Sequence, residues 1–324
     1  MSEAAARQDV VGGLVSTVIP VFNRPARLRE AVDSVLGQTY PAIEVIVIDD
    51  GSDDATPEVA RALAEAHPER VRLLIQPNAG PGAARGRGVQ AARGEFVQFL
   101  DSDDVYLPGK TARLVEALRA DPGAQVAYCR SVRRRVDGSL EPDREHRSHE
   151  CHRQLFPALL GGRLWDTNSV LYRREVLAAA GPWPALRQCE DWLFDAQVAA
   201  TGAPLVQVDE VLVELRTHDG GHLGHAWRVD ARRHRERCEA LLGVLTLAQR
   251  AGVANGTLEL ERFGRTLFFE ARMAAAAGLE AEARRLLDAA RRVVSQRRWQ
   301  LDGFAGLAAV VGWQRAAAWL NSIR

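Results

Sequence analysis

The sequence predicts an α/β fold, a mostly parallel β-sheet flanked by helices, with an all-α C-terminal extension. Between residues 14 and 110, apolar strand-like segments alternate four times with helix-like segments, which is typical of a parallel sheet covered by helices. After about residue 226 the pattern is helical to the end. The chain is 47% hydrophobic and 26% charged, a composition that can bury the core such a fold needs.

Each element of the first half follows from local signals. LVSTVIPV at 14–21 is apolar and β-branched, which predicts a buried strand, and Pro25 suits the first turn of the helix that follows. IEVIVIDD at 43–50 is the second strand, and Thr56-Pro57-Glu58 supplies a cap, a first-turn proline and a first-turn acid for the next helix. The remaining elements expected here are a strand at 71–76, a helix at about 82–92, a strand at 95–101 and a helix starting near Pro108.

Beyond residue 124 the alternation is less regular. AQVAYCRSVRRRVDGSL predicts a hairpin that turns at Asp137-Gly138, and the polar stretch 141–163 predicts a loop with a short helix. SVLYRREVLAAAG predicts a strand and then a helix, Glu190-Asp191 begin another helix, and 204–216 is a strand or a pair of strands. The helices expected in the C-terminal region are roughly 228–250, 257–277, 280–295 and 303–321.

The charge pattern supports a boundary near residue 225. Residues 1–225 carry 25 basic and 32 acidic side chains, whereas residues 226–324 carry 17 basic and 10 acidic ones. We therefore expect a flexible N-terminus at 1–13, an α/β domain at 14–225 and a helical region at 226–324. The net charge of the whole chain is zero, which disfavours nucleic acid as a partner.

Cysteine usage and the N-terminal sequence predict a cytoplasmic protein. The four cysteines form no CxxC pair and are too few for a disulfide scaffold in a chain of this length. The N-terminus lacks the charged and apolar regions of a signal peptide, and the chain has no run of 18 apolar residues that could span a membrane.

Carboxylate clusters follow two of the expected strands, and they carry most of the chemical information. Ligands of parallel α/β sheets bind beyond the carboxyl ends of the strands. Asp101-Ser102-Asp103 can present two carboxylates to one side, as a hard cation such as Mg²⁺ or Mn²⁺ requires; the alternative is a solvated acidic turn that caps the next helix. Asp50 could accept hydrogen bonds from a ribose or a base, while Asp53 and Asp54 are expected to serve the turn alone.

Taken in order, these segments resemble the family 2 glycosyltransferases of the GT-A fold over about residues 14–220. The segments are VSTVIPVFNRPARLREAVDSVLGQTYPAIEVIVIDDGSDDAT, NAGPGAARGRGVQAARGEFVQFLDSDD and CEDW. The resemblance implies an inverting transfer of a sugar from a nucleotide-diphospho-sugar, usually UDP-linked, to an acceptor hydroxyl. The sequence departs from the family at Gly86, where many members have Asn, and at Leu215, where Tyr is usual.

The resemblance also implies roles for nine residues. They are Pro20 and Phe22 flanking the base, Asp50 holding the uracil or its equivalent, Arg85 near the nucleotide, Asp101 facing the ribose, Asp103 and His218 binding a divalent cation (Mn²⁺ or Mg²⁺), Asp191 as the catalytic base and Glu190 in a supporting role. These roles agree with elementary chemistry. The leaving nucleoside diphosphate gathers negative charge that a cation stabilises, and a carboxylate in a first helical turn is held in its ionised, basic form.

Alternatives remain open at several points. A nucleotidyltransferase acting on sugar phosphates and a non-catalytic nucleotide-sugar-binding module share many of these features. His146, His149 and His152 with Cys151 could hold zinc, but we favour a mobile polar loop over the acceptor site. The acceptor is expected to be a glycan, a lipid-linked glycan or a small molecule. The C-terminal tryptophans and arginines could contact the inner face of a membrane, but we favour a packed helical cap or a dimer interface; they are Trp299, Trp313, Trp319, Arg297, Arg298, Arg315 and Arg324.

Overall fold

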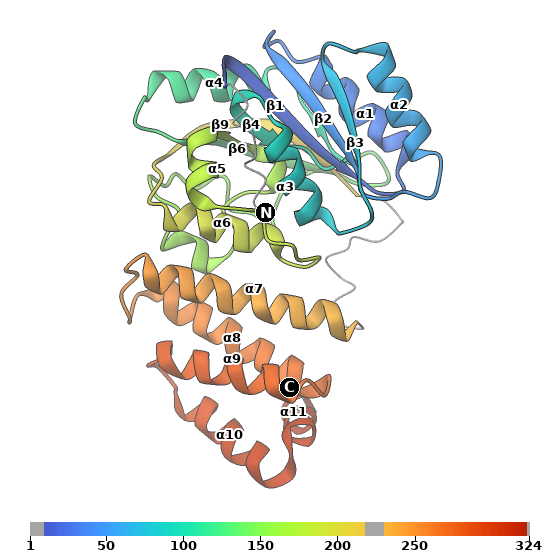
Figure 1. The fold of residues 1–324 in the computed structure, drawn as a ribbon. Coiled ribbons are helices and arrows are strands. Elements are labelled where there is room, and N and C mark those ends of the chain that lie inside the picture. The colour runs from blue at the N-terminus through green and yellow to red at the C-terminus, as the bar shows by residue number, and fades with distance from the viewer. Residues whose placement is uncertain (1–9, 218–229, 323–324) are drawn as a thin grey trace, which may run out of the picture. The chain divides into compact units, whose positions relative to one another are not determined.

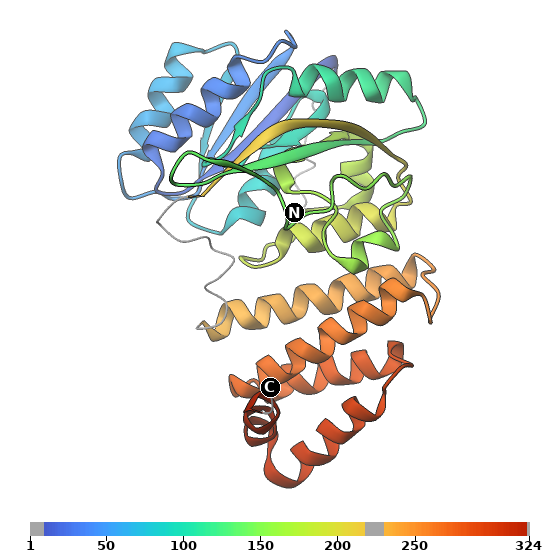
Figure 2. The same ribbon diagram turned by 180° about the vertical axis from the view of Figure 1, so that it is seen from behind.

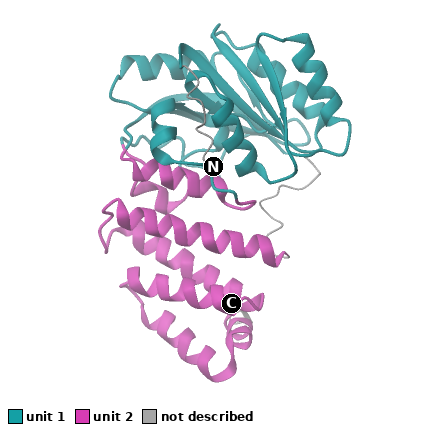
Figure 3. Ribbon diagram, in the orientation of Figure 1, with its two compact units in different colours: residues 1–153, 164–185, 203–219 teal, residues 154–163, 186–202, 220–324 magenta. Residues whose placement is uncertain are grey.

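The computed structural model describes residues 10–217 and 230–322, and it confirms the α/β fold with a helical C-terminal region (Figure 1). Contacts divide the chain into two compact units (Figure 3). Unit 1 comprises residues 1–153, 164–185 and 203–219, and unit 2 comprises residues 154–163, 186–202 and 220–324. No helix among the described residues is long and apolar enough to cross a lipid bilayer.

Unit 1 is built on a nine-stranded sheet with the order β3-β2-β1-β4-β8-β6-β9-β5, and β7 pairs with β6. Its strands are β1 (Val11–Val21), β2 (Ile43–Asp49), β3 (Val71–Ile75), β4 (Gly94–Phe99), β5 (Val105–Tyr106), β6 (Val126–Arg134), β7 (Leu140–Pro142), β8 (Val170–Arg173) and β9 (Leu205–Arg216). The four strands predicted in the first half pair in parallel. Beyond β4 the sheet is mixed, because β8 runs antiparallel to both β4 and β6, while β6 and β9 are parallel.

Helices cover both faces of this sheet (Figures 1 and 2). The buried side chains of α1 (Pro25–Leu36), α2 (Thr56–Ala66) and α4 (Lys110–Ala120) join one apolar cluster with alternate residues of the strands. The opposite face carries α3 (Pro81–Ala91) and α5 (Arg174–Ala180). On that face a Cβ at Gly88 of α3 would lie 2.2 Å from Cγ1 of Val18, so glycine permits the close approach of α3 to β1.

The predicted hairpin and loops of the second half are present. β6 and β7 pair antiparallel around Asp137-Gly138, and after β7 the predicted loop runs from residue 143 to the short helix η1 (Ala158–Gly161). A second short helix, η2 (Thr167–Ser169), leads directly into β8. The side chain of Asp166 caps η2 by accepting a hydrogen bond from the N–H of Asn168 at 2.9 Å.

Unit 2 is helical and gathers segments from three parts of the chain. Its helices are η1, α6 (Glu190–Ala200), α7 (Ala231–Arg250), α8 (Leu258–Ala276), α9 (Glu280–Val293), α10 (Trp299–Val311) and α11 (Trp313–Ser322). The expected single helix at 303–321 is wrong, because α10 ends at Gly312, whose φ of 86° is left-handed. Trp313 then packs edge-on against Phe304, with ring centroids 5.6 Å apart, which fixes the turn between the two helices.

Candidate active site

The carboxylates that follow β4 meet two arginines. Arg85 of α3 contacts Oδ1 of Asp101 at 2.6 Å, and Arg24, the N-cap residue of α1, contacts Oδ2 of Asp103 at 2.5 Å. Arg85 is 4% exposed, and its guanidinium also lies over the ring of Trp183, 5.0 Å from the centroid. The structure therefore brings Arg85 and Asp101 together, and it adds Arg24, which belongs to the VFNR segment but carried no expected role.

A buried asparagine fixes the backbone of the same loop. Asn168 of η2 is 2% exposed; its Oδ1 accepts a hydrogen bond from the N–H of Asp101 at 2.7 Å, and its Nδ2 donates to Oδ2 of Asp104 at 2.8 Å. Oδ1 of Asp104 accepts from the N–H of Arg216 at 2.7 Å. Asp104 thus connects the loop after β4 to Arg216, the last residue of β9, two positions before His218 in the sequence.

The electrostatics of this loop suit a cation. Burial raises the pKa of Asp104 well above its ordinary value, and the negative charges of Asp103 and Asp101 raise it further. The three carboxylates therefore lie close enough to interact, and those of Asp101 and Asp103 can offer oxygen ligands of the kind that Mg²⁺ and Mn²⁺ prefer. The side chains of Asp101 and Asp103 fit a hard divalent cation, although each also contacts an arginine.

Asp50 lies at the end of β2, and its carboxylate holds the loop that leads into α3. Oδ1 accepts hydrogen bonds from Nε2 of Gln76 (2.7 Å) and the N–H of Ala79 (2.9 Å), and Oδ2 accepts from the N–H of Gly80 (2.8 Å). Asp54 accepts from the N–H of Thr56 at 2.8 Å, which confirms its expected role in the turn.

The two residues expected to flank a base lie at the end of β1. Pro20 is buried and pairs in register with Ile48 of β2. Phe22 is 45% exposed, so its ring is accessible at the carboxyl edge of the sheet. At Gly86, where many family members have Asn, an added Cβ would lie 3.5 Å from Cβ of Trp183.

Asp191 belongs to unit 2, where it lies in the first turn of α6. Its Oδ2 is 2.6 Å from an NH1 nitrogen of Arg163, and the same guanidinium contacts Oδ2 of Asp195 at 3.0 Å. The side chain of Asp191 is 28% exposed. Glu190 is 7% exposed. No sequence signal marked Arg163 as a partner of Asp191.

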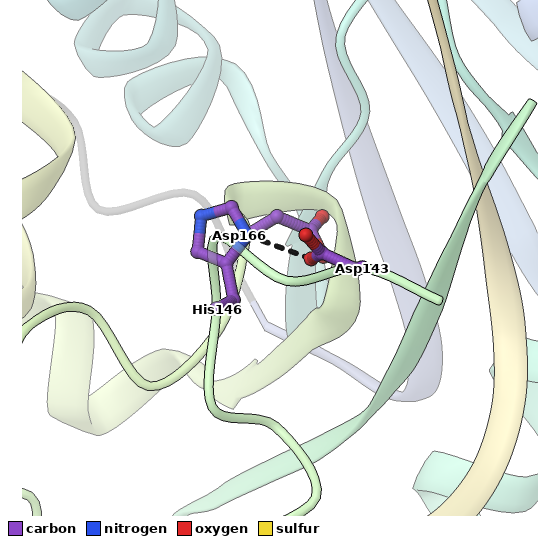
Figure 4. A group of neighbouring side chains, drawn as sticks. All are labelled: Asp143, His146 and Asp166. Carbon is purple, nitrogen blue, oxygen red and sulfur yellow. Dashed lines mark hydrogen bonds and ion pairs between the residues drawn. The ribbon is translucent and has the colours of Figure 1, made fainter. Parts of the chain in front are cut away.

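His218 lies outside the described residues. Among the described residues, one cluster of three His, Cys, Asp or Glu side chains could hold a metal ion: Asp143, His146 and Asp166, whose ligand atoms all lie within 4.8 Å of one another (Figure 4). Nδ1 of His146 is 2.7 Å from Oδ2 of Asp143, and this contact lowers the pKa of Asp143 to about 2 although burial opposes the shift. The zinc alternative had named His146 but neither aspartate.

Protein groups already satisfy the two carboxylates of this cluster. Asp143 accepts from Oγ of Ser131 at 2.9 Å and from the N–H of Glu145 at 3.0 Å, in addition to His146. Asp166 accepts from the N–H of Asn168 and from Oγ of Ser169. The three side chains could hold a metal ion. The contacts of Asp166 also give the cluster a structural role, because they cap η2.

Comparisons with known proteins identify the family. The sequence model described as "Glycosyl transferase family 2" matches residues 16–178. An uncharacterized glycosyltransferase of Rickettsia typhi is 30% identical over 222 residues, which are 66% of this chain and 67% of that protein. An uncharacterized glycosyltransferase of a Nostoc species is 33% identical over 174 residues, 52% of this chain and 53% of that protein. The chain belongs to glycosyltransferase family 2, and its matches span about half the length of the first curated relatives.

Solved structures confirm the GT-A fold. The crystal structure of S. aureus TarS residues 1–349 in complex with UDP is similar to this chain with a TM-score of 0.69 and 17% identity, over 96% of this chain and 92% of that one. The mannosyltransferase PcManGT of Pyrobaculum calidifontis in complex with GDP-Man and Mn²⁺ has a TM-score of 0.55 and 23% identity, over 94% of this chain and 84% of that one. At these identities the likeness concerns the fold.

Proposed function

We propose that this glycosyltransferase moves a sugar from a UDP-linked donor to an acceptor hydroxyl, with inversion at the anomeric carbon and with the help of a divalent cation. The observation that carries the proposal is the loop after β4, where Asp101 and Asp103 lie against Arg85 and Arg24 at the carboxyl edge of the parallel part of the sheet. In such sheets this edge is where nucleotides bind.

The donor would lie along the ends of β1, β2 and β4. We assign the base to Pro20, Phe22 and Asp50, and the ribose to Asp101. Arg85 would lie near the nucleotide, where its charge favours an anionic group. The UDP complex of TarS supports a uridine nucleotide, and the GDP-Man complex of PcManGT makes guanosine the nucleotide to test against it.

The cation, Mn²⁺ or Mg²⁺, would be held by Asp103 together with His218. When bound, it stabilises the negative charge that develops on the leaving diphosphate. Arg24 and Arg85 already neutralise part of the charge on Asp103 and Asp101. They therefore keep the two carboxylates in place at the edge of the sheet.

Asp191 would act as the general base. In a single displacement the acceptor oxygen attacks the anomeric carbon while the bond to the diphosphate oxygen breaks, and Asp191 takes the hydroxyl proton. A positioned base contributes about 10²–10⁴-fold. Arg163 would orient this carboxylate through its contact with Oδ2 at 2.6 Å, and Glu190 would support the same helical turn.

For the acceptor we propose a glycan, a lipid-linked glycan or a small metabolite, and peripheral contact with a membrane would suit a lipid-linked one. Trp313 is packed in the helical unit, whereas Trp299 on α10 is 71% exposed and Val310 on the same helix is 84% exposed. Arg297 and Arg298 directly precede α10 and are exposed. Exposed aromatic side chains beside basic ones are typical of helices that lie at an anionic lipid surface.

A thermal-shift experiment tests the donor and the cation together. UDP, GDP, dTDP and CDP are each added with Mn²⁺ and, separately, with EDTA, because a ligand that binds the folded state raises its melting temperature. The proposal predicts a shift with UDP that EDTA abolishes. A shift with another nucleotide alone would contradict the donor, and an equal shift in EDTA would contradict the cation.

A further inference from the structure

The C-terminal helices contact the residues that lead into the catalytic-base helix α6. From α7, Oε2 of Glu236 accepts a hydrogen bond from the N–H of Arg187 at 2.7 Å. Also from α7, the guanidinium of Arg237 donates to Sγ of Cys189 at 3.2 Å. Cys189 is the residue immediately before α6, two positions before Asp191. Arg187 and Cys189 are therefore both hydrogen-bonded to α7, immediately before α6 begins.

Cys189 has an unusual backbone conformation that this attachment maintains. Its φ is 55°, in the left-handed region that residues other than glycine rarely adopt. Burial raises the pKa of the thiol to about 12, so the side chain is a neutral thiol whose sulfur accepts from Arg237. Because Cys189 is the N-cap residue of α6, this contact restrains the orientation of the helix and therefore the position of Asp191.

Arg237 is itself fixed by a buried carboxylate of α8. Its Nε and an NH2 nitrogen both lie close to Oε1 of Glu270, at 3.0 and 2.8 Å. The side chain of Glu270 is 1% exposed. Two donors on one buried carboxylate oxygen restrict the orientation of the guanidinium, so α8 determines where the NH1 nitrogen of Arg237 meets Sγ of Cys189.

The next residues of α6 pack closely against the same two helices. A Cβ at Gly243 of α7 would lie 2.7 Å from Cδ1 of Leu193, so the absence of a side chain there admits Leu193. Trp192 meets Phe263 of α8 edge-on, with ring centroids 5.8 Å apart. Residues before and after Asp191 are thus fixed by α7 and α8.

We propose that the C-terminal helices serve catalysis by positioning Asp191, and that Arg237, acting through Cys189 and oriented by Glu270, is a positioning residue for the base. The inference rests on the proposed role of Asp191. It gives the helical extension a function in the transfer reaction itself. A small displacement of a reacting group can cost about 10²-fold in rate, so this attachment should appear in the turnover number.

The test compares turnover with nucleotide binding in the full chain. Turnover is measured as UDP release from UDP-GlcNAc with Mn²⁺, and binding as the Kd of UDP with Mn²⁺, both at a temperature where circular dichroism shows every variant folded. The variants are Cys189→Ala, Cys189→Ser, the charge-balanced pair Arg237→Met with Glu270→Met, and Asp191→Asn. The matched control is Arg235→Met, whose side chain on α7 is 57% exposed and contacts Glu282.

The proposal predicts that the double variant lowers kcat at least tenfold with the Kd of UDP unchanged. It predicts a smaller loss in Cys189→Ala that Cys189→Ser restores, since a hydroxyl also accepts from Arg237, and no change in Arg235→Met. If Asp191→Asn abolishes turnover while the double variant keeps it, the positioning role is refuted and the proposed function stands. If Asp191→Asn keeps full turnover, both fail.

Discussion

Replacing Asn168 by alanine removes two hydrogen bonds that hold the loop after β4. The N–H of Asp101 and Oδ2 of Asp104 each lose a partner at less than 3 Å, and Asn168 itself is 2% exposed. A buried polar group left without a partner costs about 1–3 kcal/mol. We take the lower end for Asp101, whose side chain is 35% exposed, so the total is about 2–4 kcal/mol. For a domain of this size that lowers Tm by roughly 5–15 °C.

The same change should weaken metal-dependent nucleotide binding, because the loop that carries Asp101 and Asp103 is no longer fixed. We expect the Kd of UDP with Mn²⁺ to rise about tenfold, measured by calorimetry, with Tm measured by circular dichroism. Asn168→Asp should lose at least as much stability, since its second oxygen would face the carboxylate of Asp104. Asn255→Ala, at an exposed loop position, is the control. An Asn168→Ala protein with wild-type Tm and wild-type Kd would refute the reasoning.

Three further predictions concern packing, charge and the C-terminal surface. Gly88→Ala should destabilise unit 1 by about 1–3 kcal/mol, because the new methyl group would collide with Val18 of β1; an unchanged denaturation midpoint would contradict the close packing of α3. Burial lowers the pKa of Lys110 from 10.5 to about 8, so between pH 8 and pH 10.5 the unfolded chain binds more protons at this residue than the folded protein does. The contribution of Lys110 to the free energy of unfolding therefore rises with pH in this range, by about 1.4 kcal/mol per pH unit. The difference in unfolding free energy between wild type and Lys110→Met should therefore increase from pH 8 to pH 10, and a constant difference would exclude the shift. Replacing Trp299 and Val310 by serine should abolish sedimentation with phosphatidylglycerol-containing vesicles; wild type that does not sediment with them would refute the membrane contact.

The sequence was informative wherever local chemistry determines structure. The parallel strands lie where the apolar runs predicted them, because these runs are short and bounded by turn residues. β2 ends at Asp49 and β4 at Phe99, one and two residues before the predicted ends. Asp101 and Asp103 share an edge with Asp50 because parallel strands place their carboxyl ends together. These regularities follow from period and composition alone.

Long-range partners could not be foreseen from the sequence. Asn168 lies 67 positions beyond Asp101, and the antiparallel pairing of β4 with β8 is what brings η2 to that loop. Nothing local to Arg163 marks it as the partner of Asp191, because η1 and α6 are separated by β8 and α5 in the chain. The break between α10 and α11 depends on Gly312 and on the packing of Trp313, a tertiary contact that overrides an otherwise helical pattern.

Donor turnover is the sharpest test of the proposed cation-assisted sugar transfer, in which Asp103 and Asp191 would both take part. UDP-sugars are incubated with the protein and Mn²⁺, and the nucleotide product is identified by chromatography for wild type, Asp103→Ala and Asp191→Ala. We expect wild type to release UDP and each variant to lose at least 100-fold in rate. Release of pyrophosphate would indicate a nucleotidyltransferase instead, and undiminished UDP release by both variants would contradict the proposed function.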